Sequence, residues 1–135
     1  MKQFSKFKNP FIFLLSLGLS LFVLFFIVTS SWIGYDIKSK CRESKADYGG
    51  NCNQALISLL KDKNRSFNSR NSAIWAIGQI GNPLSLPVLQ SFYTGDIPNR
   101  EPLNEMISQY ELKKAINLTS GSPNITAIFW KYNLD

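Results

Sequence analysis

The chain has 135 residues but contains no histidine and only two cysteines. Without histidine, no serine or cysteine nucleophile can be activated by an imidazole base, and zinc loses its usual nitrogen ligand. Two cysteines alone cannot complete a structural zinc site, which takes four ligands. The sequence also lacks a phosphate-binding loop and a dinucleotide fingerprint. We therefore expect no catalytic, cofactor or metal site, no small-molecule substrate, and no enzymatic activity.

Acid–base chemistry by carboxylates is the one enzymatic alternative. Asp96, Glu101 and Glu105 lie close together in a stretch rich in Pro, Gly, Asp and Asn, with Arg100 among them. Such a composition is typical of a solvated loop. We interpret this cluster as a connection between helices rather than as an active site.

Charge is absent from residues 9 to 35. Within this stretch the run from Phe11 to Val28 is apolar apart from two serines and a glycine, and as a helix it would measure roughly 27 Å, close to a ~30 Å bilayer core. We predict a basic flank at 1–9 (Lys2, Lys6, Lys8), a transmembrane anchor at 10–33 that contacts the lipid bilayer, and a linker at 34–50. A cleaved signal peptide is the alternative, with Val28-Thr29-Ser30 as a weak cleavage site.

Basic residues are in moderate excess, with 15 Lys and Arg against nine Asp and Glu. Three of the basic residues precede the apolar run, so 12 face the nine acids in the remainder, a net charge of +3. This dispersed charge does not predict nucleic-acid binding. The basic residues flanking the apolar run on its two sides are too evenly matched to fix its orientation.

The two cysteines, Cys41 and Cys52, are eleven positions apart just beyond the apolar run. A disulfide between them would close a small loop and indicates an oxidising compartment. In the alternative both thiols are free and Cys52 is a core residue of a helix. The disulfide favours an extracytoplasmic body on a single-pass protein, with the bacterial inner membrane as the favoured location.

Helix signals fill residues 51–121. Asn51 and Gln54 form a capping-box pattern ahead of a helix that ends near residues 61–63. A second helix is predicted over 69–80 with Gly81 after it, a third carries Leu86, Leu89 and Tyr93, and a fourth covers 103–118. The aromatic tail at 122–135 is too apolar for a free terminus, so we expect it to pack back as a cap.

These helices form an internal repeat. Residues 55–59 align with residues 85–89, and Ala76-Ile77 with Ala115-Ile116, offsets of 30 and 39 that are typical of an α-solenoid built from helix pairs. The stretch from Ala55 to Leu89, with Asp62 and Arg70 in it, resembles the HEAT-like repeat of bacterial proteins. The resemblance covers residues 51–118, and the layout is similar to small membrane-anchored HEAT-repeat proteins of unassigned role. It implies an all-α fold of about two helix pairs behind the membrane helix, tied together by Asp62 and Arg70.

Five residues are candidates for contact with a protein partner: Trp75, Gln79, Lys113, Lys114 and Trp130. Trp75 and Gln79 lie opposite the apolar stripe of their helix, where an exposed aromatic could anchor an interface. The alternatives are that Trp75 packs on the next helix or on Tyr48 and that the lysines are solvated. Two helix pairs leave open ends, which we expect Tyr48 to cover on one side and the tail on the other, unless a partner takes the tail.

These observations predict a membrane-anchored HEAT-repeat protein that acts as a protein–protein interaction module at the cell envelope. A different function is also open, namely a structural subunit of a larger membrane complex without independent recognition. The partner is an unidentified protein in either case.

Overall fold

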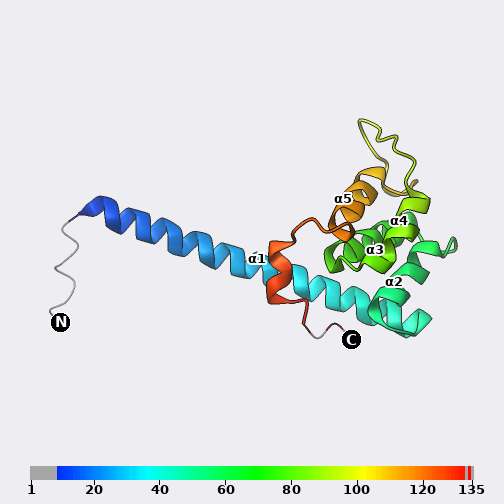
Figure 1. The fold of residues 1–135 in the computed structure, drawn as a ribbon, viewed down its shortest axis with the longest axis horizontal. Helices are drawn as coiled ribbons and strands as arrows, with labels where there is room; N and C mark the ends of the chain where they lie inside the picture. The colour runs from blue at the N-terminus through cyan, green and yellow to red at the C-terminus, as the bar shows by residue number, and fades with distance from the viewer. Residues whose placement is uncertain (1–8, 133, 135) are drawn as a thin grey trace.

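The computed structural model describes residues 9–132 and 134, and within this part of the chain every regular element is a helix and no strand occurs (Figure 1). The all-α class is thus confirmed. The α-helices are α1 (Pro10–Tyr48), α2 (Cys52–Lys61), α3 (Phe67–Ile80), α4 (Leu86–Phe92) and α5 (Gln109–Thr119), and the 3-10 helices are η2 (Pro83–Ser85) and η3 (Ile125–Phe129). The predicted basic flank with Lys2, Lys6 and Lys8 lies outside the described residues.

The N-terminal half of α1 stands away from the rest of the protein (Figure 1). Asn9 caps it by accepting a hydrogen bond from the backbone of Phe11, and Pro10 starts the helix where its missing N–H costs nothing. An 18-residue window of α1 has a mean hydropathy of 2.9, and none of it is buried. This is the one described helix that is long and apolar enough to cross a membrane.

The C-terminal half of α1 packs along the other helices through a narrow seam of mostly small side chains. Its buried residues are Ser30, Gly34, Ile37, Cys41 and Ser44. Their spacing of four, three, four and three residues places them on one face of a helix. The segment that we predicted as a linker, residues 34–50, is therefore helical as far as Tyr48. The prediction was wrong about this segment because its buried face contains serine and glycine, so the face does not appear in the sequence as an apolar stripe.

Helices α2 and α3 form a hairpin beside this half of α1. The capping box predicted at Asn51 and Gln54 is present, and Asp62 ends α2. Gly81 ends α3 in the left-handed conformation (φ 63°), which glycine adopts without steric cost. Between the helices lies a core of fully buried side chains: Leu56, Leu60, Ile74, Ile77, Leu89 and Leu112. Burying each such side chain contributes about 1.5–3 kcal/mol to folding.

The chain after α3 turns through η2 into α4, and Pro87 lies in the first turn of α4, where it interrupts no hydrogen bond. We predicted a fourth helix from residue 103, but α5 begins only at Gln109. The loop before it is held open by Asn71, whose amide donates to the carbonyls of Leu103 and Met106, 3.0 Å each. Helix α3 packs mainly against α2 and α5.

Candidate functional site

The predicted partner residues divide between two places in the structure. Trp75, Gln79 and Lys114 line one small hollow of about 70 Å³ between α3 and α5, together with Glu111. We call the surface around this hollow the α3–α5 face. Trp75 is half-buried and packs against the core, and its role as a partner anchor stays a prediction. Lys113 is exposed on α5 but does not line the hollow.

A close crossing of the two helices creates the α3–α5 face. A Cβ atom at Gly78 would lie 2.7 Å from Cα of Ala115, so only glycine permits this approach. On α5, the ammonium of Lys114 lies 2.6 Å from a carboxylate oxygen of Glu111 and 4.6 Å from the ring centre of Tyr110. Sequence analysis missed the roles of Glu111 and Tyr110, although their spacing of three and four residues from Lys114 on one helix is a usable signal.

Trp130, by contrast, is a core residue. Only 4% of its surface is exposed, and it packs directly on Gly34 of α1. A partner could reach this side chain only if the tail left its place. We therefore correct its assignment as a partner-binding residue: an aromatic residue near a chain end is as easily buried as exposed, and sequence alone does not separate the two.

Asp62 and Arg70 do not form the predicted ion pair. The guanidinium of Arg70 donates instead to the carbonyl of Leu60 at the end of α2, 2.8 Å away, and lies over the rings of Phe67 and Phe92. Arg70 is largely buried, so its charge is held by one hydrogen bond and two aromatic faces at the edge of the core. Arg70 still ties its neighbouring helices together, but through a backbone carbonyl and aromatic faces.

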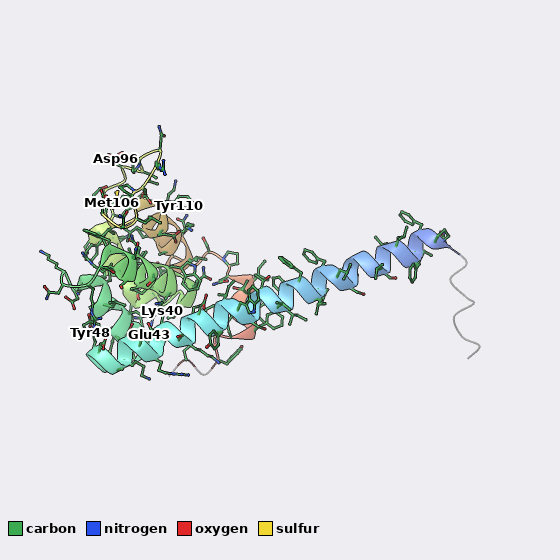
Figure 2. All side chains as sticks on the ribbon, turned by 180° about the vertical axis from the view of Figure 1, so that it is seen from behind. Lys40, Glu43, Tyr48, Asp96, Met106 and Tyr110 are labelled. Atoms are coloured by element: carbon green, nitrogen blue, oxygen red, sulfur yellow. A yellow bond between two sulfur atoms is a disulfide. The ribbon has the colours of Figure 1, made fainter. Side chains whose placement is uncertain are left out.

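Asp62 belongs to a polar cluster at the far end of α1, where Figure 2 labels Tyr48. The Tyr48 hydroxyl donates to Asp62 over 2.6 Å, and Arg65 donates to the Tyr48 oxygen and to Asp47. The hydrogen bond to Asp62 raises the pKa of Tyr48, and the same bond lowers the pKa of the Asp62 carboxyl. The cluster fastens the end of α1 to the α2–α3 turn.

Of the two predicted states of the cysteines, a disulfide or two free thiols, the structure contains the disulfide. Cys41 of α1 and Cys52 of α2 form a disulfide pair, with their Cα atoms 4.9 Å apart. Both side chains are buried in the core. The pair fixes the turn between α1 and α2 at the point where the chain reverses direction.

At least one carboxylate of the acidic loop, that of Glu101, has a structural role. Glu101 accepts hydrogen bonds from the Ser108 hydroxyl and from the backbone of Gln109 (2.7 Å) and Tyr110 (3.1 Å). Its carboxylate therefore caps the N-terminus of α5, where a negative charge also complements the helix dipole. Asp96 and Glu105 are exposed (Asp96 is labelled in Figure 2). Within the described residues no group of three His, Cys, Asp or Glu side chains could hold a metal ion.

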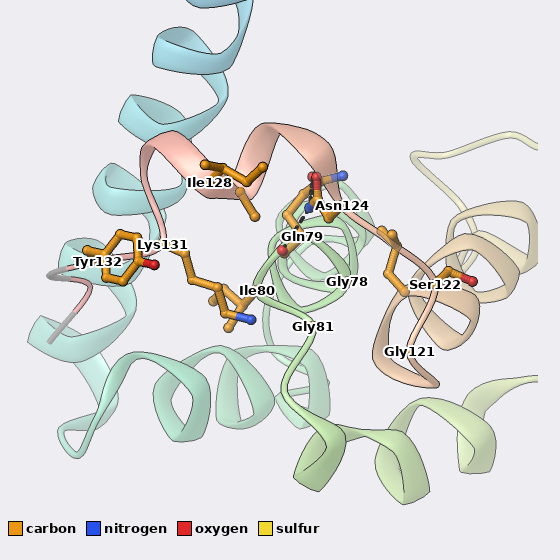
Figure 3. A pocket seen from close by; sticks show the side chains of 12 residues that line it. Gly78, Gln79, Ile80, Gly81, Gly121, Ser122, Asn124, Ile128, Lys131 and Tyr132 are labelled. Atoms are coloured by element: carbon orange, nitrogen blue, oxygen red, sulfur yellow. Dashed lines mark hydrogen bonds between the residues drawn. The ribbon is translucent and has the colours of Figure 1, made fainter.

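A groove of about 530 Å³ was not predicted by the sequence analysis (Figure 3). The C-terminal end of α3, the turn after α5 and the tail line it, and among the described residues that line it only Lys131 is charged. Asn124 crosses the groove and donates to the backbone and side-chain oxygens of Gln79, over 3.0 and 2.9 Å. Gln79 is thus engaged within the protein. Composition gave no signal for this groove, because three of its lining residues are glycines.

We compared the chain with protein-family models, with curated proteins and with solved structures. It matches none of them. The resemblance to HEAT repeats therefore rests on the sequence pattern of this chain and stays a prediction.

Proposed function

We propose that this protein is a single-pass membrane protein whose helical module binds a protein partner at the cell envelope. The observation that carries the proposal is the continuity of α1. One unbroken helix of 39 residues supplies both the exposed apolar stretch and a wall of the module's core. A module built around its own membrane helix is held at a fixed height above the bilayer.

The same continuity supports a retained anchor over a cleaved signal peptide. The weak cleavage site at Val28-Thr29-Ser30 lies inside α1, and Ser30 is fully buried. Just before it, the ring of Phe26 contacts the ring of Phe129 in the tail. Cleavage there would remove Phe26, and with it this contact, from the mature protein.

Two equivalent contacts support a HEAT-like repeat. Arg70, at the start of α3, donates to the carbonyl of Leu60 at the end of α2. Gln109, at the start of α5, donates to the carbonyl of Phe92 at the end of α4, 3.3 Å away. The second helix of each pair thus reaches back to the end of the first in the same manner, although the residue types differ. The C-terminal half of α1 covers the side of α2 that an earlier repeat would otherwise cover.

The partner surface that we propose is the α3–α5 face. Interfaces are commonly anchored by a large aromatic side chain surrounded by polar groups. Trp75 supplies the half-buried aromatic, and Lys114 and Glu111 supply the surrounding charges. Tyr110, 54% exposed, extends the aromatic surface along α5.

Site-specific photo-crosslinking in native membranes tests this function. In one variant of the full-length chain a photoreactive residue replaces Lys113 on α5. In a second variant it replaces Lys63, an exposed residue beyond α2, as the matched control. We expect one discrete protein adduct from position 113 and none from position 63. Trp75→Ala should abolish the adduct, whereas Trp32→Ala, outside the module, should leave it.

Two results would count against the proposal. An adduct that survives Trp75→Ala would mean that the α3–α5 face is not the recognition surface. Adducts confined to a photoreactive residue at Leu19, in the apolar half of α1, would favour the structural-subunit function, in which the anchor alone makes the contact.

A further inference from the structure

The tail of the protein lies across α1 at one end of its apolar stretch. Trp130 packs on Gly34, and the ring centres of Phe26 and Phe129 are 5.8 Å apart. Asn124 holds the other end of the tail on α3 through Gln79. These contacts fix η3 against the module, so η3 cannot rotate about its own axis to bury its exposed side chains.

The tail carries four exposed apolar or aromatic side chains, and two of them, Ile128 and Tyr132, border the groove against α3. The exposed fractions are 62% for Ile125, 67% for Ile128, 53% for Phe129 and 77% for Tyr132. Four large side chains of this kind within eight residues form a patch that a protein in water rarely leaves open. Lys131 is the only charged residue between positions 122 and 132.

The patch is continuous with the surface of α1 that would face lipid. Through Phe26 it joins Ile27 and Val28, each 42% exposed. The 18-residue run that ends at Val28 covers roughly 27 Å of a ~30 Å hydrocarbon core. Phe129 contacts α1 inside the last turn of this run and Trp130 contacts it about two turns later, so η3 lies where the hydrocarbon meets the headgroups.

The side chains at this level are those that membranes select there. Trp32 and Tyr35 of α1 are 72% and 75% exposed, and Tyr132 of the tail adds a third amphipathic ring. Tryptophan and tyrosine concentrate at membrane–water interfaces.

We propose that the tail is a second membrane-contacting element, with Ile125, Ile128 and Phe129 inserted into the phospholipid interface beside α1. This inference rests on the proposed anchoring of α1 and adds a contact that anchoring alone does not require. It makes two points of attachment, α1 and η3, so the module is held at a defined height and cannot swivel freely about its anchor.

Spin-label accessibility in phosphatidylcholine vesicles tests the proposal on the full chain. The native cysteines are paired, so a nitroxide attaches only to an introduced cysteine. Ile128→Cys reports on the tail and Leu19→Cys on the apolar half of α1. Leu84→Cys is the matched control, because Leu84 is apolar, 79% exposed, and lies on η2, which bonds to α2 through Ser85 and Asn53.

We expect the label at 128 to resemble the label at 19. Its collision rate with a water-soluble nickel chelate should be several-fold lower than at 84, and its collision rate with oxygen higher. Circular dichroism and the thermal transition of each labelled protein verify that the fold is kept.

Each other outcome overturns the inference in a distinguishable way. If the label at position 19 is protected but the label at position 128 collides with the chelate as often as the label at position 84, α1 is in the membrane and the tail is not. If 128 is shielded from both reagents, protein covers the patch, and dipolar broadening between labels would identify a second copy of the chain. If 19 itself is open to the chelate, the proposed anchoring fails as well.

Discussion

At the scale of single residues, the seam between α1 and the tail depends on a missing side chain. A Cβ atom at Gly34 would collide with Trp130, lying 2.8 Å from its Cγ atom. Nothing lies within 4 Å of the equivalent position at Gly18, in the apolar half of the same helix. Alanine at Gly34 therefore tests the packing against Trp130, whereas alanine at Gly18 changes helix propensity without changing any contact.

We predict that Gly34→Ala lowers the free energy of unfolding by about 1–3 kcal/mol, the usual cost of overpacking. Thermal unfolding followed by tryptophan fluorescence measures the effect, with a red-shifted emission as Trp130 becomes hydrated. Gly18→Ala should leave both the transition and the emission maximum unchanged. Equal behaviour of the two variants would mean that Trp130 does not pack on α1.

A second residue-scale prediction concerns Asp62. Its pKa is lowered on folding, chiefly by the hydrogen bond from Tyr48. A carboxyl with a lowered pKa stabilises the folded state above the pKa of the unfolded chain, and this contribution is lost as the pH falls through the folded value.

We therefore expect Asp62→Asn to be less stable than the wild type at neutral pH. The difference in melting temperature should begin to shrink near the ordinary aspartate pKa of about 3.9, and should shrink further as the pH falls through the lower pKa of the folded state. Melting curves recorded across this range check the prediction, with Asp96→Asn in the exposed loop as a control that shows no such convergence. A constant difference at every pH would assign the effect to shape rather than to charge.

At the scale of elements, helix ends were easier to predict than helix lengths. The capping box at Asn51 and the left-handed Gly81 are local patterns, because the residues that form them are neighbours in sequence. The extension of α1 to Tyr48 depends on a seam of small residues whose partners lie on α2 and in the tail. The local sequence therefore does not predict how far α1 extends.

The same limit explains the misplaced start of α5. Residues 103–108 have helical spacing, but Asn71, more than 30 positions earlier, binds the carbonyls that a helix would use. The candidate surface was likewise only partly predictable. Trp75 and Lys114 could be selected by their positions on helices, whereas the burial of Trp130 depends on Gly34, almost a hundred residues away.

The cap on α5 gives an element-scale prediction. Glu101 accepts three hydrogen bonds at the start of this helix. Removing the carboxylate leaves backbone donors unsatisfied, and loss of a helix cap costs about 0.5–2 kcal/mol. We expect Glu101→Ala to lower stability by this amount in chemical denaturation, and Glu105→Ala, an exposed acid of the same loop, to have no effect. Equal losses would mean that the loop acid is not a cap.

At the scale of the whole molecule, three features act together. A helix of 39 residues is about 58 Å long, roughly twice the thickness of a hydrocarbon core, so α1 extends well beyond any bilayer that it crosses. The other helices pack on one face of the part that extends beyond it, and η3 crosses this part (Figure 1). The Cys41–Cys52 disulfide lies in that part, and disulfides persist in oxidising compartments.

The disulfide therefore predicts the orientation of the protein, which the flanking charges do not decide. With the module on the extracytoplasmic side, a membrane-impermeant maleimide added to bacterial spheroplasts should label Leu84→Cys, because Leu84 is exposed on the module. Ser5→Cys, before the apolar stretch, should react only after the membrane is permeabilised. The opposite pattern would place the module in a reducing compartment, where the cysteine pair would be expected to open. The turn between α1 and α2 would then be held by the capping box at Asn51, the Tyr48–Asp62 hydrogen bond and the Arg65–Asp47 ion pair.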